Sequence, residues 1–236
     1  MVTSTDIEYK NAKLIKQGKE KIDTKFKELA DWISVKYKVT VLNINHELMD
    51  NNDQIRIGIA VETYEDYLKF KENDERWSNY DEKIQNEIAE KYIELNDDNL
   101  KIQSDKKLFG LFTLKEKPRP KNIFVATSAF EPIAREDVNV QIPEQRIEKL
   151  VNDFKSDKIW TISRCFATAT LFVFTDKQKA EFKNSDIFKK IENSYFDLLK
   201  EYDEFNYWKR EKFTLGIDSK QFFDEKCESN WYYYYK

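Results

Sequence analysis

The sequence predicts an α+β protein in which long amphipathic helices pack on antiparallel sheets. Apolar residues recur at helical spacing in the first segment and again beyond residue 175, and short β-branched runs between polar turns predict strands. Hydrophobic residues make up 40% of the chain and aromatic residues 15%, which is enough to fill a core. The length of 236 residues suits one large domain or two small ones, and we expect two lobes, 1–130 and 143–236.

The first segment carries apolar residues from Ile7 to Ile33, mostly at steps of three, four and seven, which places them on one helix face. Gly18 is unfavourable within a helix and predicts a break there. A strand over 39–44, a turn over 50–53 and a strand over 55–61 are expected to follow.

Thr63 is expected to cap a helix that begins at Tyr64 and runs to about Leu95. The expected features from here to residue 127 are an interruption at 73–79, a helix end at 97–99, strands over 108–114 and 122–127, and a Pro-rich loop at 117–120.

In the second half, Pro143 opens a predicted helix that ends at Phe154. Residues 158–175 are either two strands with an unmarked turn or one long bent strand. Thr175 or Asp176 caps a helical stretch to about Phe205. The remaining expected elements are a strand over 213–217, a helix over 219–227 and a final strand over 231–235.

The two halves share residues at a constant offset of 112. Val61-Glu-Thr63 matches Val173-Phe-Thr175, and Phe70-Lys71 matches Phe182-Lys183. These matches are interpreted either as two α-β-β-α-β repeats or as chance in a chain rich in Lys and Phe.

Several functional classes are excluded by composition. The four glycines are far apart, so no window can cradle a phosphate as in Walker-type NTPases, Rossmann dinucleotide binders or kinases. Cys165, Cys227 and the single histidine, His46, form no recognisable zinc motif. We expect no cofactor, no metal and no catalytic constellation.

The chain is mildly acidic, with a net charge of −4, which argues against nucleic acid as a partner. No signal peptide or membrane-length apolar run is present, and two sparse cysteines suit a reducing cytoplasm. The Lys-, Ile-, Asn- and Tyr-rich composition resembles that of proteins from AT-rich bacterial genomes.

Two polar residues are candidates for chemistry. His46 precedes Glu47 and is interpreted as a general base with a raised pKa or as an exposed turn residue. Arg164 alternates with Trp160 and Ile162 on one strand face, where a cation needs a carboxylate, an aromatic ring or a pocket. Either a structural ion pair or an anion-binding role would satisfy it.

The last 32 residues contain 11 aromatic residues and end in Trp231-Tyr-Tyr-Tyr-Tyr235. If this end is a strand, alternate side chains face opposite ways, so one set can be core and the other can contact a partner. The candidate contact residues are Trp208, Trp231, Tyr233 and Tyr235.

These observations favour a non-catalytic cytoplasmic binding protein, such as an immunity or inhibitor protein that occludes a protein partner. The alternative is an enzyme or small-ligand sensor with a pocket between the lobes that uses Arg164 and His46.

Overall fold

The structure is a computed structural model that describes residues 2–49, 54–75, 78–96, 102–108, 112–154 and 157–236, with side chains except at 74 and 102–116. The described chain forms two compact units, an N-terminal unit to Pro132 and a C-terminal unit from Ile133. The segment 131–142, which the predicted lobes leave out, lies almost entirely in one helix, α5 (Phe130–Gln141).

The N-terminal unit begins with two helices that are separated near Gly18, whose φ of +70° suits a residue without a β-carbon. In chain order its elements are α1 (Ile7–Lys16), α2 (Thr24–Tyr37), β1 (Val41–Leu48), β2 (Ile55–Val61), α3 (Tyr64–Leu68), α4 (Glu82–Asn96), the hairpin β3 (Ile102–Leu108) and β4 (Phe112–Glu116), and β5 (Ile123–Ala129), with short 3-10 turns at 72–74 and 120–122.

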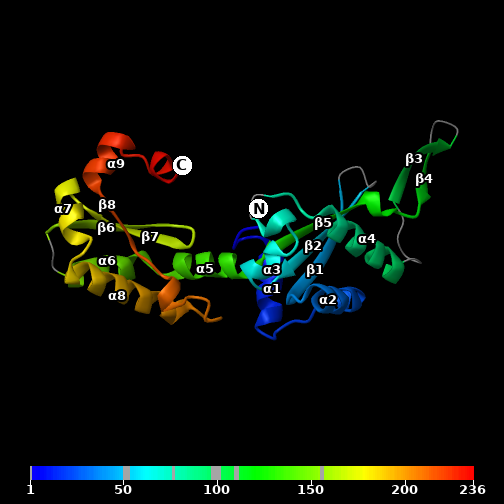
Figure 1. The fold of residues 1–236 in the computed structure, drawn as a ribbon, viewed down its shortest axis with the longest axis horizontal. Coiled ribbons are helices and arrows are strands. Elements are labelled where there is room, and N and C mark those ends of the chain that lie inside the picture. Colours follow the sequence, from blue (N-terminus) through cyan, green and yellow to red (C-terminus); the bar gives the residue numbers. More distant parts are fainter. Residues whose placement is uncertain (1, 50–53, 76–77, 97–101, 109–111, 155–156) are drawn as a thin grey trace. The chain divides into compact units, whose positions relative to one another are not determined.

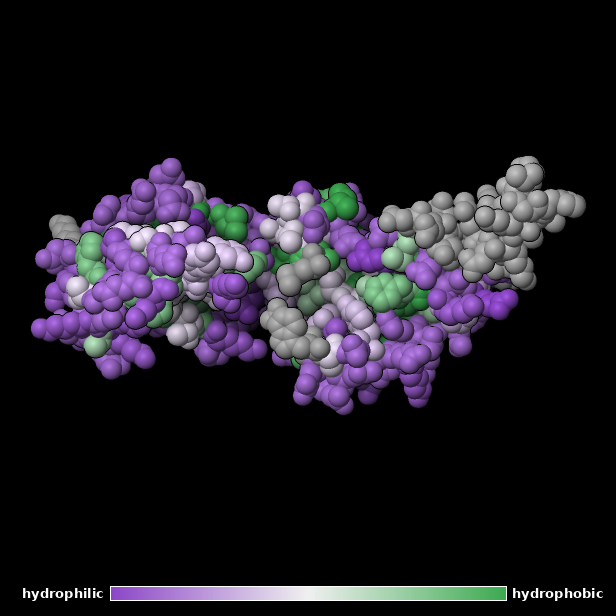
Figure 2. Space-filling view, turned by 90° about the horizontal axis from the view of Figure 1, so that it is seen from above, coloured by the Kyte–Doolittle hydropathy of each residue, from purple (hydrophilic) through white to green (hydrophobic). Residues whose placement is uncertain are grey.

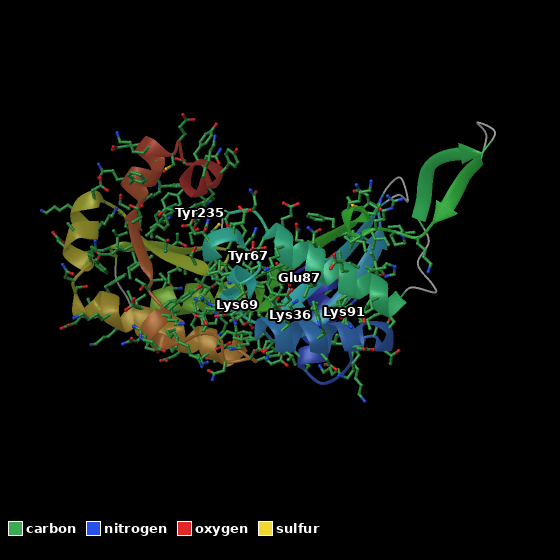
Figure 3. All side chains as sticks on the ribbon, turned by 45° about the vertical axis from the view of Figure 1, so that its right-hand side comes forward. Lys36, Tyr67, Lys69, Glu87, Lys91 and Tyr235 are labelled. Carbon is green, nitrogen blue, oxygen red and sulfur yellow. The ribbon has the colours of Figure 1, made fainter. Side chains whose placement is uncertain are left out.

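The central sheet of this unit, in the order β1-β2-β5, has helices on both faces (Figure 1). On one face, apolar side chains of β2 such as Ile57 and Ile59 pack with α2 and α4. Glu87 on α4 joins these two helices by binding Lys36 Nζ at 2.7 Å and the Tyr37 hydroxyl at 2.9 Å (Figure 3). On the other face, Glu8 of α1 accepts hydrogen bonds from strand side chains.

The C-terminal unit has the central sheet order β6-β7-β8. After α5 its elements are α6 (Glu144–Asp153), β6 (Ile159–Cys165), β7 (Thr168–Val173), α7 (Asp176–Phe182), α8 (Asp186–Tyr202), a 3-10 turn at 210–212, β8 (Gly216–Ser219), α9 (Lys220–Lys226) and α10 (Trp231–Tyr235). Helices α6 and α8 cover one sheet face, and α9 and α10 lie on the other (Figure 1).

The α+β class predicted from the sequence is confirmed, but both three-stranded sheets are mixed. In each, the first two strands are antiparallel and the third is parallel to the second. Two helices lie between the second and third strands of each sheet, and such a crossover returns the chain in the same direction. The prediction of antiparallel sheets missed this crossover.

Residues 158–175 form two strands with an unmarked turn, which is one of the two predicted alternatives. Phe166 takes a left-handed conformation (φ 51°) and turns the chain without Gly, Pro, Asn or Asp. Two other predicted elements differ in the structure. The long helix from 176 divides into α7 and α8, since Ser185 caps a new helix. The predicted final strand, Trp231 to Tyr235, is wrong, because these residues are helical.

Other predicted elements overlap the observed ones, although the strand predicted over 213–217 begins at Gly216 and ends at Ser219. Thr63 and Thr175 cap α3 and α7 through their hydroxyl groups. The predicted turn at 50–53, the helix end at 97–99 and the middle of the predicted strand at 108–114 lie outside the described residues.

Candidate functional site

The candidate site is the aromatic end of the C-terminal unit, formed by α9, α10 and the sheet face beneath them. Ser219 caps α9, where its hydroxyl oxygen accepts from Phe222 N–H at 2.9 Å. Asn230 caps α10, where its side-chain oxygen accepts from Tyr232 N–H at 2.9 Å. The two polar caps place consecutive aromatic residues on two short helices.

The inner face of α10 consists of Trp231, Tyr234 and Tyr235, which share one side because they are spaced by three and four residues. Trp231 stacks on Trp160 of β6, with ring centroids 5.9 Å apart and planes within 8°. Its ring also lies 4.2 Å from that of Phe223 on α9. This packing extends the buried cluster around Phe172 and fixes α10 against the sheet.

Two tyrosine hydroxyls anchor this inner face to polar groups of the strands. Tyr234 donates to Asp218 Oδ2 at 3.0 Å, while the Tyr235 and Ser163 hydroxyls lie 2.7 Å apart. Burial raises the pKa of both tyrosines, and the nearby Asp218 carboxylate raises that of Tyr234 further. Both phenols are therefore neutral hydrogen-bonding groups at physiological pH.

The outer face of α10 presents Tyr232 and Tyr233, whose exposed fractions are 66% and 50%. A strand would have exposed alternate residues, whereas the helix exposes two consecutive ones. Of the predicted contact residues, Tyr233 lies on this exposed face, Trp231 is 37% exposed at its edge, and Tyr235 is half-buried. Tyr232, which the sequence reasoning did not select, is the most exposed of the five.

The turn that joins α9 to α10 has an unusual backbone. Glu228 and Ser229 both have positive φ, 52° and 53°, and Asn230 N–H donates to the Cys227 carbonyl at 2.8 Å. These features match a type I′ turn, which favours Asn and Gly at its two central positions. Side chains with β-carbons are strained there.

Trp208, the remaining aromatic candidate, is buried in the C-terminal unit with 2% exposure. Its ring lies under the Arg135 guanidinium, whose central carbon is 4.4 Å from the ring centroid. Its backbone N–H donates to Asp203 at 2.9 Å. In this conformation Trp208 offers a partner no surface.

The Arg164 guanidinium binds three groups of its own unit. Its Nη1 donates to the carbonyls of Asn139 at 2.6 Å and Ile142 at 2.8 Å, and its Nη2 contacts Glu144 Oε2 at 2.7 Å. A cation at the C-terminal end of α5 satisfies carbonyls that lack partners within the helix. The observed geometry is the structural ion pair and not a vacant anion site.

His46 lies toward the exposed end of β1, on the sheet face that α2 covers. Its ring meets that of Phe26 edge-on with centroids 5.7 Å apart. The neighbouring Glu47 carboxylate instead forms an ion pair with Arg56, with Oε1 2.7 Å from Nη1. His46 is exposed, yet partial desolvation beside the Phe26 ring and, secondarily, the charge of Lys25 lower its pKa. The raised pKa expected from a carboxylate neighbour is therefore not found.

His46 and Arg164 belong to different units, and each has its contacts within its own unit. An open groove of about 580 Å³ lies between α6 and α8 on the C-terminal unit, lined by residues such as Lys149, Phe154 and Asp197. Neither His46 nor Arg164 lines it. Arg146 and Glu201 also line it and form an ion pair, with Arg146 Nη2 2.9 Å from both carboxylate oxygens.

Within the described part of the chain, no group of three or more His, Cys, Asp or Glu side chains is placed to hold a metal ion. Over the same residues, no helix combines the length and apolar character needed to cross a membrane. Comparison with models of known protein families, with characterised proteins and with solved structures gives no match.

Proposed function

We propose that this chain is a non-catalytic binding protein that uses the outer face of α10 to contact a protein partner. The observation that carries the proposal is the exposure of Tyr232 and Tyr233 on a helix whose other face is anchored to the sheet. Tyrosine supplies a large contact area with a polar tip and is enriched at protein interfaces. A rigidly held pair loses little conformational freedom on binding.

The surroundings of this face support a protein ligand. Trp231, 37% exposed, precedes it in the helix, and Lys236 Nζ lies 5.7 Å from the Tyr232 ring centroid. An aromatic centre with charged groups at its rim is the usual composition of a protein interface. Figure 2 shows a mostly hydrophilic surface with scattered hydrophobic patches.

Cytoplasmic residence in a bacterium, as an immunity or inhibitor protein that occludes its target, is the biological setting we propose. It rests on the sparse cysteines, the mild acidity and the composition of the chain. The alternative enzyme or sensor with Arg164 and His46 in one pocket gains no support, because Arg164 already binds two carbonyls and a carboxylate.

We also infer that the two units are copies of one α-β-β-α-β unit. Support comes from their identical strand order and directions and from the threonine caps 112 residues apart. Equivalent backbone bonds recur as well: Glu131 N–H donates to the Glu62 carbonyl at 2.9 Å, and Gln221 N–H donates to the Phe174 carbonyl at 3.0 Å. An experimental structure in which segments 61–70 and 173–182 differ in element type or chain direction would refute duplication.

Capture of a partner from the native host tests the binding proposal. The unsubstituted chain is expected to retain a specific protein, and Tyr232→Ala/Tyr233→Ala is expected to lose it while its melting temperature stays within a degree or so. Val35→Ala, at an 80% exposed site of α2 in the N-terminal unit, is the matched control and should retain the partner. Equal capture by all three proteins, or no specific capture by the unsubstituted chain, contradicts the proposal.

A further inference from the structure

The inner face of α10 covers the sheet face around Trp160 and Phe172, and the short segment 230–236 supplies this cover. Trp231, Tyr234 and Tyr235 supply its ring contacts and both hydroxyl anchors, and they reach strands β6 and β8. Without this segment, Trp160 and part of the cluster around Phe172 lose their cover. The surface therefore requires an occupant, and residues 230–236 are complementary to it.

The turn that connects α9 to α10 within one chain is strained. Glu228 and Ser229 are consecutive residues with positive φ and carry β-carbons, whereas this turn type favours Asn followed by Gly. Compensation comes from the Ser229 hydroxyl, which donates to Asp224 at 2.7 Å, and from Ser229 N–H, which donates to the Phe223 carbonyl at 3.1 Å. In an extended hinge both residues return to ordinary φ values, and water replaces those bonds.

From this strained hinge and the fit of the terminal segment we infer that two copies of the chain exchange residues 230–236 and form a reciprocal dimer. In the dimer each α10 occupies the partner subunit's sheet face, so every contact of α10 is kept and two turns are relieved. Exchange of an identical element is a low-cost route to a dimer, and strained short hinges promote it. The exchange occupies the inner face of α10, so it is separate from partner binding by Tyr232 and Tyr233.

Sedimentation equilibrium of the 236-residue chain tests this exchange. Across roughly 10 to 500 micromolar protein, the unsubstituted chain is expected to show a reversible monomer–dimer equilibrium. Glu228→Asn/Ser229→Gly supplies the preferred turn residues, and it should weaken dimerisation at least about tenfold by favouring the closed monomer. The matched control Glu228→Ala/Ser229→Ala removes the same side-chain contacts but keeps both β-carbons, and it should not weaken dimerisation.

A hinge deletion provides the positive arm of the experiment. Removing residues 228 and 229 prevents α10 from folding back on its own chain, so this variant should be dimeric throughout the concentration range. Adding Trp231→Ala and Tyr235→Ala to the deletion should return it to monomer, which identifies α10 as the connecting element. A hinge deletion that stays monomeric, or an Asn-Gly variant that dimerises as strongly as the unsubstituted chain, overturns the inference.

Discussion

Tyr195 on α8 donates its hydroxyl hydrogen to Oδ1 of Asn139 on α5, at 2.7 Å, and both side chains are buried. The Asn139 amide nitrogen in turn donates to the carbonyls of Phe166 at 2.8 Å and Thr168 at 3.0 Å. One buried amide thus joins two helices to the turn between β6 and β7. This turn has no Gly, Pro, Asn or Asp of its own, and it is held by the two hydrogen bonds from the Asn139 amide.

Tyr195→Phe should lower the free energy of unfolding by about 1–3 kcal/mol, because a buried acceptor on Asn139 is left without its donor. Urea denaturation measures this loss. Tyr233→Phe removes a hydroxyl from an exposed ring and serves as the control, with an expected change near zero. Equal stability of the two variants would contradict a role for the buried amide.

Arg164→Met should destabilise the protein by about 2–3 kcal/mol, since it leaves two carbonyls at the end of α5 without a charged donor. Glu144→Gln removes only the partly exposed ion pair and should cost less than about 1 kcal/mol. Thermal unfolding of both variants separates the two contributions. A larger effect of Glu144→Gln would show that the ion pair matters more than the carbonyl contacts.

The pKa of His46 should lie below its ordinary value of 6.5, and proton NMR can measure it directly because the chain has one histidine. A lowered pKa means that the unfolded chain binds the proton more readily, so the contribution of His46 to stability is complete above pH 6.5. It is lost as the pH falls through the folded-state pKa.

Lys25→Gln should raise the pKa of His46, since the Lys25 charge is one cause of its lowering. Asp23→Asn should move it in the opposite direction, because that carboxylate favours the protonated ring. Shifts of the same sign in both variants would refute this electrostatic account.

Thr63→Val and Thr175→Val should each cost about 1 kcal/mol, because each removes a hydroxyl that accepts a backbone N–H at a helix start. Denaturant titration measures both losses. Thr63→Ser and Thr175→Ser keep the cap and should restore most of the stability. Failure of serine to restore it would assign the loss to packing of the methyl group.

Deleting residues 231–236 should lower the melting temperature by several degrees, since two or three partly buried rings contribute more than about 1 kcal/mol and each kcal/mol shifts a protein of this size by about 2–4 °C. Trp231→Ala should account for much of that shift and Tyr232→Ala for little, because only the first ring packs on Trp160. Equal shifts for the two variants would show that α10 does not pack by its inner face.

The sequence was sufficient to predict most of the helices and strands, because their apolar residues recur at regular spacing over long segments. It was insufficient for residues 231–235, since five consecutive aromatic residues satisfy a strand and a helix equally well. Asn230 was the overlooked signal: a side chain that can cap a helix directly before the run. Helix α5 was missed although Phe130, Ala134 and Val138 follow one another at steps of four.

The sequence drew attention to the aromatic residues 231–235, but it predicted the wrong set of exposed side chains among them. Strand periodicity pairs Tyr233 with Tyr235, whereas helical periodicity pairs Tyr235 with Trp231 and leaves Tyr232 beside Tyr233. The partners of Arg164 could not be foreseen, because two of them are backbone carbonyls in and directly after a helix that was not predicted. Such contacts depend on the tertiary fold and leave no local pattern.

The hairpin β3–β4 has a practical consequence for engineering. It lies between α4 and β5, where the C-terminal unit passes from α8 to β8 without strands. Among the described residues, β3 and β4 pair with each other and with no other strand. The three-stranded sheet of the N-terminal unit, β1-β2-β5, therefore includes neither strand of the hairpin. Replacing residues 102–116 with a reporter domain whose ends lie close together should preserve the fold of that unit, which makes the hairpin a suitable insertion point for fluorescent labelling.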